Sequence, residues 1–383
     1  MYSMNSNYSR RSLLKIIMCG VFSVVALIFT RNRNLRKLKD MGKNDSSILS
    51  ITELPETGPW PTVDPFLFCV HHNDNYPAAK DDLSPDVSLS GRQLGNDFSN
   101  KDGWSMYHGQ KIPGFPRHPH RGFETLTVVS EGFIDHADSL GASARYGDGD
   151  AQWLTAGDGI NHSEMFPLFS QNENNNLDFF QIWLNLPSYN KRVEPNFEMY
   201  WKDEIPKISS NLNGNKKAQV EIITGDYLDF SSPIAPQNSW ANNKKNDVAV
   251  WIITLGRNGN FAIPDTQSGA NRNLYILNDS NMEIDGQSIS GGSMVTLDSS
   301  KNTVIKNLGG KTKILMLQGV PINEPVVKYG PFVMNTRSEI EQAFYDYNKT
   351  EFGGWEWGKS DPVHGIEKEK FAKLINGDII KPS

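Results

Sequence analysis

The sequence predicts an all-β protein with two domains and an extension at each end. Short apolar runs are separated by turn residues along most of the chain, which contains 32 Gly and 21 Pro. Helical spacing of apolar residues is scarce, and short strands bounded by turn residues are typical of β-sandwiches and β-barrels. The length of 383 residues exceeds that of most single domains, so we expect two domains.

The first block of predicted strands covers residues 63–205. It begins with an apolar run at 66–70 and continues through a polar, irregular excursion at 78–107. Short strands then alternate with tight turns at the spacing expected of a barrel, and the run LDFFQIWLNLP closes it. We expect His71 and His72, which follow the first apolar run, to lie on the surface rather than to bind metal.

A second block at 215–322 repeats the strand-and-turn pattern but contains no histidine. A barrel formed by these residues therefore cannot hold a histidine-ligated metal, and we expect it to contribute stability or recognition. The segment at 323–352 contains the pattern Thr336-x-x-Glu339, a capping box, and apolar residues follow it at helical spacing. We therefore predict one amphipathic helix there, followed by a polar tail at 353–383.

Residues 1–40 are predicted to be a leader or membrane anchor outside the fold. The apolar run at 16–30 has basic residues on both sides and is short for a membrane-spanning helix. A cleaved organelle-targeting leader and an uncleaved anchor through residues 13–30 both fit this pattern. The heavier positive charge after the run would leave the body of an anchored protein in the cytosol, and neither alternative is nuclear. Residues 41–62 are predicted to be a linker.

The charge distribution argues against direct binding of nucleic acid. The first 39 residues carry eight Lys or Arg and no Asp or Glu, which leaves 30 Lys and Arg against 44 Asp and Glu in the remainder. An acidic body lacks the positive surface that nucleic acids attract. The two cysteines, Cys19 and Cys69, provide no disulfide framework, which favours a reducing compartment for the folded part.

Two pairs of potential metal ligands lie in the first block, at His118-x-His120 and His162-x-Glu164. Residues two apart in a strand point to the same face, so each pair offers two ligands to one point. Three neutral imidazoles and one carboxylate suit a divalent first-row metal with open coordination positions, and iron is the first candidate. Because imidazoles bind metal in the neutral form, the affinity should fall as the pH drops through about 6.5.

Several motifs match one protein family in order along the chain. They are DPFLF (64–68), HPHRGFET (118–125), GDAQWLTAGDGINHSEM (149–165), QIWLNLP (181–187), VEPNFE (193–198) and GPFVMNT (330–336). On these motifs the chain resembles the pirin family, iron-binding members of the cupin superfamily. The resemblance implies two stacked cupin-type β-barrels (a bicupin) with a single Fe²⁺ in the N-terminal barrel. Carried across position by position, the ligands are His118, His120, His162 and Glu164.

Glu164 and Glu124 are the two candidate catalytic residues. Glu124 lies four residues beyond His120, would share its face in a continuous strand, and stands where many other cupins place their acidic ligand. The pirin resemblance favours Glu164 as the ligand and leaves Glu124 nearby, as its partner or as a base. Four aromatic or apolar neighbours would either line the pocket or belong to the core; they are Phe115, Phe123, Trp153 and Met165.

The resemblance also implies a reaction. Pirin-like proteins are associated with quercetin 2,3-dioxygenase activity, the O2-dependent ring cleavage of a flavonol with loss of CO. By resemblance, a flavonol-like aromatic molecule and O2 would be the substrates, and Glu164 or Glu124 would accept the proton of the flavonol. The alternative is an iron-dependent co-regulator that binds a protein partner without turnover, as some nuclear pirin-like proteins do. A third possibility is that the iron only stabilises the barrel.

Overall fold

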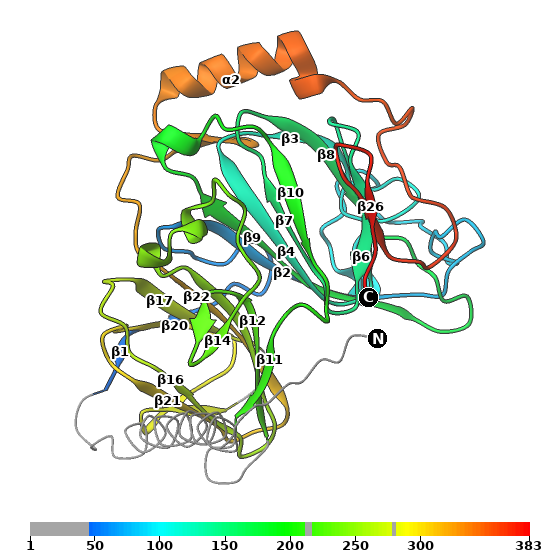
Figure 1. The fold of residues 1–383 in the computed structure, drawn as a ribbon. Helices are drawn as coiled ribbons and strands as arrows, with labels where there is room; N and C mark the ends of the chain where they lie inside the picture. Colours follow the sequence, from blue (N-terminus) through cyan, green and yellow to red (C-terminus); the bar gives the residue numbers. More distant parts are fainter. Residues whose placement is uncertain (1–45, 211–216, 278–280) are drawn as a thin grey trace, which may run out of the picture.

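The computed structural model of the protein describes residues 46–210, 217–277 and 281–383. The predicted leader at 1–40 lies outside the described residues. The described chain forms two β-barrels, one stacked on the other, and a single long helix covers the far side of the first barrel (Figure 1). The all-β class and the C-terminal helix are confirmed. Within the described ranges, no helix combines the length and hydropathy that a membrane span needs.

The first barrel is built from a five-stranded sheet and a six-stranded sheet. The five-stranded sheet has the order β10-β7-β4-β9-β2, with β2 (Phe66–Tyr76), β4 (Phe123–Glu131), β7 (Ala151–Thr155), β9 (Asn175–Asn185) and β10 (Asn196–Tyr200). The six-stranded sheet has the order β26-β25-β6-β5-β8-β3, with β3 (Gly114–His120), β5 (Phe133–Asp138), β6 (Ser143–Gly147), β8 (Ile160–Met165), β25 (Phe371–Lys373) and β26 (Ile379–Ile380). Single-turn 3₁₀ helices lie at Lys101–Gly103 and Ser188–Asn190.

Strand β2 shows how alternation divides the side chains between two environments. Phe68, Val70 and His72 line a cavity inside the first barrel. Cys69 belongs instead to the core between the barrels, and His71 stacks on Phe180 in the same core. Successive residues of a strand point to opposite faces, so the two neighbouring histidines serve different sides of the sheet. The prediction that both lie on the surface is wrong, because both faces of the strand are covered at these two residues.

The second barrel contains a seven-stranded sheet of order β1-β20-β17-β22-β15-β12-β11 and a four-stranded sheet of order β16-β21-β18-β19. The larger sheet is formed by β1 (Ile48–Glu53), β11 (Lys207–Ser210), β12 (Ala218–Thr224), β15 (Ala249–Leu255), β17 (Asn271–Ile276), β20 (Ser293–Leu297) and β22 (Thr312–Gly319). The smaller is formed by β16 (Asn260–Ile263), β18 (Met282–Ile284), β19 (Gln287–Ile289) and β21 (Thr303–Asn307). A short hairpin, β13 (Asp226–Tyr227) and β14 (Phe230–Ser231), and 3₁₀ turns at Trp240–Asn242 and Lys244–Asn246 complete this half.

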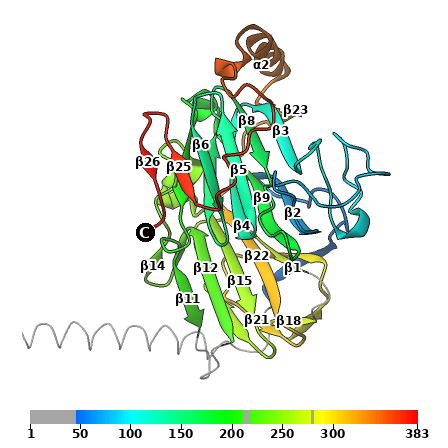
Figure 2. The same ribbon diagram turned by 90° about the vertical axis from the view of Figure 1, so that its right-hand side faces the viewer.

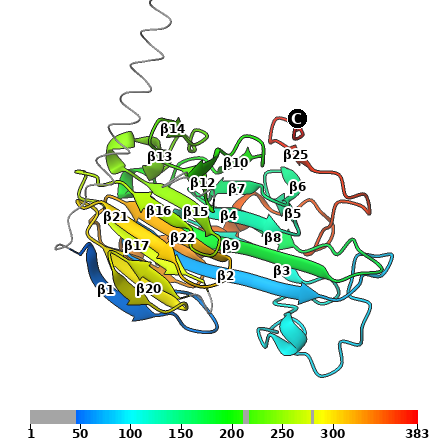
Figure 3. The same cartoon turned by 90° about the horizontal axis from the view of Figure 1, so that it is seen from below.

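The segment at 41–62, predicted to be a linker, contains a strand of this second barrel. Its β1 pairs antiparallel with β20, so the N-terminal end of the described chain forms an edge of the larger sheet (Figure 3). The run that follows also packs, since Trp60 stacks on Tyr275 of the second barrel at 5.5 Å between ring centroids. The polar composition of this segment hid the strand, because an edge strand needs few buried side chains.

The barrels meet through their five- and seven-stranded sheets. Leu126 and Ile182 of the first barrel share one apolar cluster with Val250 and Leu317 of the second. Two further clusters fill the interiors of the first and the second barrel separately. Each of these two sheets therefore buries both faces, as its nearly continuous apolar strands require.

The C-terminal segment covers one end of the first barrel. A hairpin of β23 (Val327–Tyr329) and β24 (Phe332–Met334) leads into helix α2 (Arg337–Thr350) and a 3₁₀ turn at Glu351–Gly353. The predicted capping box between Thr336 and Glu339 is present, and Ile340 and Ala343 are buried against the hairpin. The prediction for this helix is confirmed at the level of individual residues.

The polar tail at 353–383 is also part of the first barrel. Its strand β25 pairs antiparallel with β6, beside which it lies in Figure 2. The indole nitrogen of Trp357 donates a hydrogen bond to the carbonyl oxygen of Asp138 at 2.7 Å. The tail therefore extends the sheet that carries β3 and β8, the two strands of the predicted metal ligands.

Candidate metal centre

Strands β3 and β8 bring three of the predicted ligands together. The strands pair antiparallel, with His118 directly opposite His162. The ring centroids of His118 and His162 are 4.4 Å apart, and the ring of His120 lies 4.8 and 4.9 Å from these two. One nitrogen from each histidine lies within 4.8 Å of the others, which is the spacing of a potential metal site.

The hydrogen bonds of two of the histidines identify their free nitrogens. His118 Nδ1 lies 2.9 Å from the carbonyl oxygen of Pro116. A carbonyl only accepts, so Nδ1 carries the proton and Nε2 keeps its lone pair for a metal. His120 Nδ1 has a longer contact of the same kind, 3.4 Å, with the carbonyl oxygen of Pro331 in the C-terminal segment. Backbone acceptors on the second nitrogen are the usual way in which proteins orient metal-binding histidines.

His162 provides the strongest test of whether a metal fits. The residue is fully buried, and neither of its ring nitrogens has a hydrogen-bond partner among the described residues. A buried nitrogen without a partner is costly, because it has lost its contacts with water and gained nothing. A cation held by His118, His120 and His162 would satisfy one of these nitrogens, so the residues present fit a metal ion.

The electrostatics of the cluster favour the protonation state that metal binding needs. Burial lowers the pKa of His118 to about 4, and it lowers the pKa values of His120 and His162 well below the ordinary value. Neighbouring imidazoles act in the same direction for His120 and His162, because each would repel a second positive charge. The three rings are therefore neutral at pH 7 and have lone pairs available.

Glu164 lies on the wall of the same cavity but outside the compact group of three histidines. Its Oε2 accepts a hydrogen bond from Gln181 Nε2 at 3.2 Å, and its Oε1 lies 3.2 Å from Thr127 Oγ1. Burial raises the pKa of this carboxyl group, while the two polar partners oppose that rise. Gln181, which projects from β9, thus holds the carboxylate in place beside the histidines.

Glu124 does not share the site, contrary to the prediction. Its carboxylate accepts hydrogen bonds from Thr155 Oγ1 at 2.7 Å and from Ser239 Oγ at 2.6 Å, and Ser239 belongs to the second barrel. The chain turns at Gly122, where φ is +84°, and passes from the sheet of β3 to the sheet of β4. The alternation of side-chain directions counted from His120 is therefore interrupted at this turn. Glu124 points between the barrels, like Leu126.

His136 is a neighbour of the cluster that the sequence analysis missed. It is fully buried on β5, directly opposite Glu164, with its ring 5.6 Å from that of His162. Its Nε2 lies 3.0 Å from Asp138 Oδ2, which orients the ring. The pattern His136-x-Asp138 on an apolar strand was the available signal, because a buried strand places both side chains on one face.

Together with Glu164, two histidines of the cluster, His118 and His120, line a cavity of about 490 Å³, a size common for small-molecule sites. Its lining comes from β2, β3, β8, β9 and the loop before β3; the residues are Phe68, Val70, His72, His108, Phe115, Pro116, Arg117, His118, His120, Glu164, Gln181 and Trp183.

Of the four aromatic or apolar candidates for the cavity wall, only Phe115 lines it. Phe123 packs behind the site, against the rings of His120 and Trp183. Trp153 belongs to the core between the barrels, and Met165 belongs to a small cluster under the loop at 78–113.

Comparisons with known proteins agree with this fold. The Pirin family matches residues 52–184, and the Pirin C-terminal cupin domain matches residues 250–353. A Vibrio cholerae protein named "putative quercetin 2,3-dioxygenase" is 34% identical over 248 residues, which are 63% of this chain and 80% of the relative. Pirin-like protein 2 of Arabidopsis thaliana is 34% identical over 277 residues, which are 68% of this chain and 77% of the relative.

The fold also matches a solved structure. The crystal structure of quercetin 2,3-dioxygenase from Acinetobacter baumannii aligns with a TM-score of 0.63 at 24% sequence identity, over 81% of this chain and 99% of that chain. Two stacked barrels, the second of which matches the Pirin C-terminal cupin domain, define a two-domain protein of the cupin type. Within that class, the chain belongs to the pirin family.

Proposed function

We propose that the protein is a mononuclear iron enzyme of the dioxygenase type, with a flavonol-like aromatic molecule and O2 as its substrates. The main support is the convergence of three neutral imidazoles, two of which line a cavity large enough for a small molecule. Relatives named as putative quercetin 2,3-dioxygenases support the substrate class.

The metal would be held by His118, His120 and His162, with Glu164 as the fourth ligand. The donor set of three imidazoles and one carboxylate suits iron(II) and leaves open positions. The chemistry that iron supplies when bound is Lewis acidity toward oxygen ligands and activation of O2. Gln181 would keep its hydrogen bond to one oxygen of Glu164 and so fix the direction of the other.

The cavity walls would select and position the aromatic substrate. Phe68, Val70 and Trp183 form one apolar wall, and Phe115 projects from β3 near the histidines. Aromatic rings pack well against such side chains and exclude water from the reacting groups. Lys328 covers Phe68 and Trp183, with its ammonium nitrogen 5.3 and 4.8 Å from the two ring centroids. A planar, hydroxylated aromatic molecule matches this combination of surfaces.

The test is metal analysis combined with turnover of a flavonol panel. We expect about one iron per chain and O2-dependent consumption of quercetin with release of CO. The variant His118→Ala should lose both, because a residue of the ligand set is removed. Undiminished turnover in His118→Ala would contradict metal-based catalysis. Full iron content without consumption of any flavonol would instead favour the co-regulator function.

For residues 1–40, which lie outside the described residues, we propose a membrane anchor with a cytosolic body or a cleaved organelle leader. The support is the apolar run at 16–30 with basic residues on both sides. A fluorescent tag at the C-terminus would show the cellular location of the protein. Fractionation would separate a membrane-bound form from a processed, shorter one. A nuclear signal would contradict both alternatives.

A further inference from the structure

His72 lies on the cavity wall but is not one of the metal ligands. It projects from β2 into the first barrel, 7% exposed, and its ring stacks on Phe179 at 4.4 Å between centroids. Its Nδ1 lies 2.9 Å from the hydroxyl oxygen of Tyr107. Within the described parts of the chain, its Nε2 makes no hydrogen bond. A histidine held on one nitrogen and free on the other is available to a ligand in the cavity.

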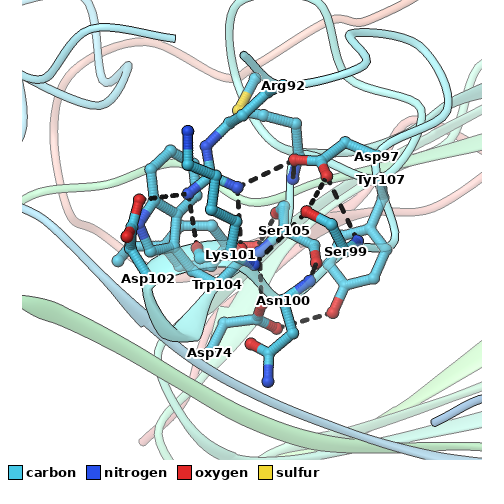
Figure 4. Close-up of polar contacts among 12 residues, drawn as sticks. Asp74, Arg92, Asp97, Ser99, Asn100, Lys101, Asp102, Trp104, Ser105 and Tyr107 are labelled. Carbon is cyan, nitrogen blue, oxygen red and sulfur yellow. Dashed lines mark hydrogen bonds and ion pairs between the residues drawn. The ribbon is translucent and has the colours of Figure 1, made fainter. Parts of the chain in front are cut away.

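Tyr107 connects His72 to a buried carboxylate. Its hydroxyl group donates a hydrogen bond to Asp74 Oδ2 at 2.8 Å (Figure 4). A tyrosine has only one hydroxyl proton, so the bond between Tyr107 and His72 must use the proton of His72 Nδ1. The tautomer is thereby fixed, and Nε2 of His72 carries a lone pair. The result is a continuous chain of hydrogen bonds from the cavity to Asp74.

The alternation of β2 and a strained backbone hold this chain in place. His72 and Asp74 are two residues apart on one strand and point to the same side. Tyr107 has a φ of +55°, a conformation that L side chains rarely adopt. It is kept there by two backbone hydrogen bonds of 2.8 Å with Asp97. Backbone strain of this kind persists only where the surrounding structure holds the residue in place, and it is common at functional sites.

A polar network secures the loop that carries Tyr107. Asp74 Oδ1 accepts a hydrogen bond from the backbone nitrogen of Ser105 at 2.9 Å. The guanidinium group of Arg92 stacks 3.3 Å above the ring of Trp104 and pairs with Asp97 at 2.9 Å (Figure 4). The irregular excursion predicted from the sequence is therefore an ordered support for one tyrosine and one aspartate.

We propose that His72, Tyr107 and Asp74 form a proton relay that removes the hydroxyl proton of an aromatic substrate bound in the cavity. This inference rests on the proposed function and adds the proton acceptor of the reaction. The O–H bond of the substrate breaks as an N–H bond forms at His72 Nε2. The Nδ1 proton of His72 passes to the oxygen of Tyr107, and the former hydroxyl proton of Tyr107 passes to Asp74. The substrate oxygen keeps the electron pair.

The protonation energetics of His72 and Asp74 agree with this direction. Burial, with a smaller contribution from His71, lowers the pKa of His72 to about 3, so an imidazolium is unfavourable. His72 therefore passes a proton on rather than keeping it. Burial raises the pKa of Asp74 to about 6, so its carboxylate is ionised at pH 7 yet accepts a proton more readily than an exposed aspartate. Glu164 is then free to serve only as a ligand.

The relay can be tested without O2, by the absorption spectrum of quercetin or a catechol bound to the iron-loaded full chain. An ionised aromatic hydroxyl absorbs at longer wavelength than a neutral one. In the wild type we expect the bound probe to be ionised at pH 7. In Tyr107→Phe, and independently in Asp74→Asn, the pH of half-ionisation should rise by one unit or more, because each variant interrupts the relay.

Tyr76→Phe is the matched control. It removes the hydroxyl group of a neighbouring buried tyrosine that donates to the carbonyl oxygen of Ser105 and takes no part in the relay. It should leave the ionisation unchanged, and equal iron content would show that all variants fold. A neutral bound probe in the wild type, equal ionisation in every variant, or no binding of either probe would overturn the relay.

The two proposals fail separately. Ionisation that depends on Tyr107 in a protein without O2-dependent turnover would contradict the dioxygenase function and leave the relay standing. Turnover with release of CO that is equally fast in the wild type, Tyr107→Phe and Asp74→Asn would support the function and reject the relay.

Discussion

The two barrels share an architecture of paired sheets but differ in what fills them. The interior of the first barrel contains polar groups, among them His118, His162, Thr127 and Gln181, next to a cavity. The second barrel has a large apolar interior cluster, with Val220, Ile253, Leu274, Val295 and Met316 among its members, and residues 215–322 contain no histidine.

This difference shows how the molecule divides its tasks. Buried polar groups cost stability unless they are paired, and the first barrel contains several whose partners are incomplete. The second barrel supplies apolar packing along the shared face, which helps to offset that cost. We therefore propose that one barrel carries the chemistry and that the other acts as its scaffold.

The largest effect is expected from His162→Ala. This change removes a buried ligand whose nitrogens have no other partner in the described structure, so metal affinity should fall at least about 100-fold, or about 3 kcal/mol. Metal analysis after dialysis measures it. His71→Gln is the control, since His71 faces the second barrel and pairs with Asp178, and it should keep one metal per chain. Full metal content in His162→Ala would contradict the assignment.

The complementary change is Leu274→Ala in the second barrel. Leu274 is fully buried in the interior cluster, so its truncation should lower the free energy of unfolding by about 2–5 kcal/mol. Denaturant unfolding measures this loss. The metal content of the folded fraction should stay unchanged, because Leu274 packs inside the second barrel whereas the histidines lie on strands of the first. A loss of metal at full stability would argue against separate roles for the barrels.

An effect of intermediate size is expected at the contact between the barrels, from Glu124→Gln. Burial raises the pKa of Glu124 from 4.5 to about 7. The folded state therefore favours the protonated form, and this contribution to stability is complete below pH 4.5 and is lost as the pH rises through 7. It amounts to about 3 kcal/mol at most. The free energy of unfolding of Glu124→Gln, relative to that of the wild type, should therefore increase as the pH rises from 4.5 to 8. If the free energies of unfolding of the two proteins changed equally with pH, this prediction would be contradicted.

The smallest effect is expected on the surface of the second barrel. The ion pair of Lys244 and Asp226 is largely exposed, with 79% and 49% of the side chains accessible. Exposed pairs are screened by water and salt, so Lys244→Ala should change the free energy of unfolding by less than about 0.5 kcal/mol. A larger loss, measured by the same denaturant unfolding, would show that this surface carries more stability than its exposure suggests.

Features with a local signature in the sequence could be predicted. His118, His120 and His162 were found because their spacing and the family motifs agree, and helix α2 because its capping box is local. Glu124 was misplaced because a turn at Gly122 moves the chain from one sheet to the other, which residue counting does not register.

The proposed role of His72 could not be predicted from the sequence either. It depends on contacts with Tyr107, 35 residues further along the chain, and on which face of β2 is covered by which barrel. Strand β1 and the tail strand β25 were missed for a similar reason, since both are short additions to the edges of sheets formed by distant residues. Local patterns fixed the elements with strong apolar periodicity, and tertiary pairing decided the others.

The most direct test of the account is anomalous diffraction from crystals of the iron-loaded protein. The account predicts one iron peak in the first barrel, within bonding distance of the free nitrogens of His118, His120 and His162, and none in the second barrel. A peak elsewhere, or the absence of a peak between these three residues in fully loaded protein, would contradict it.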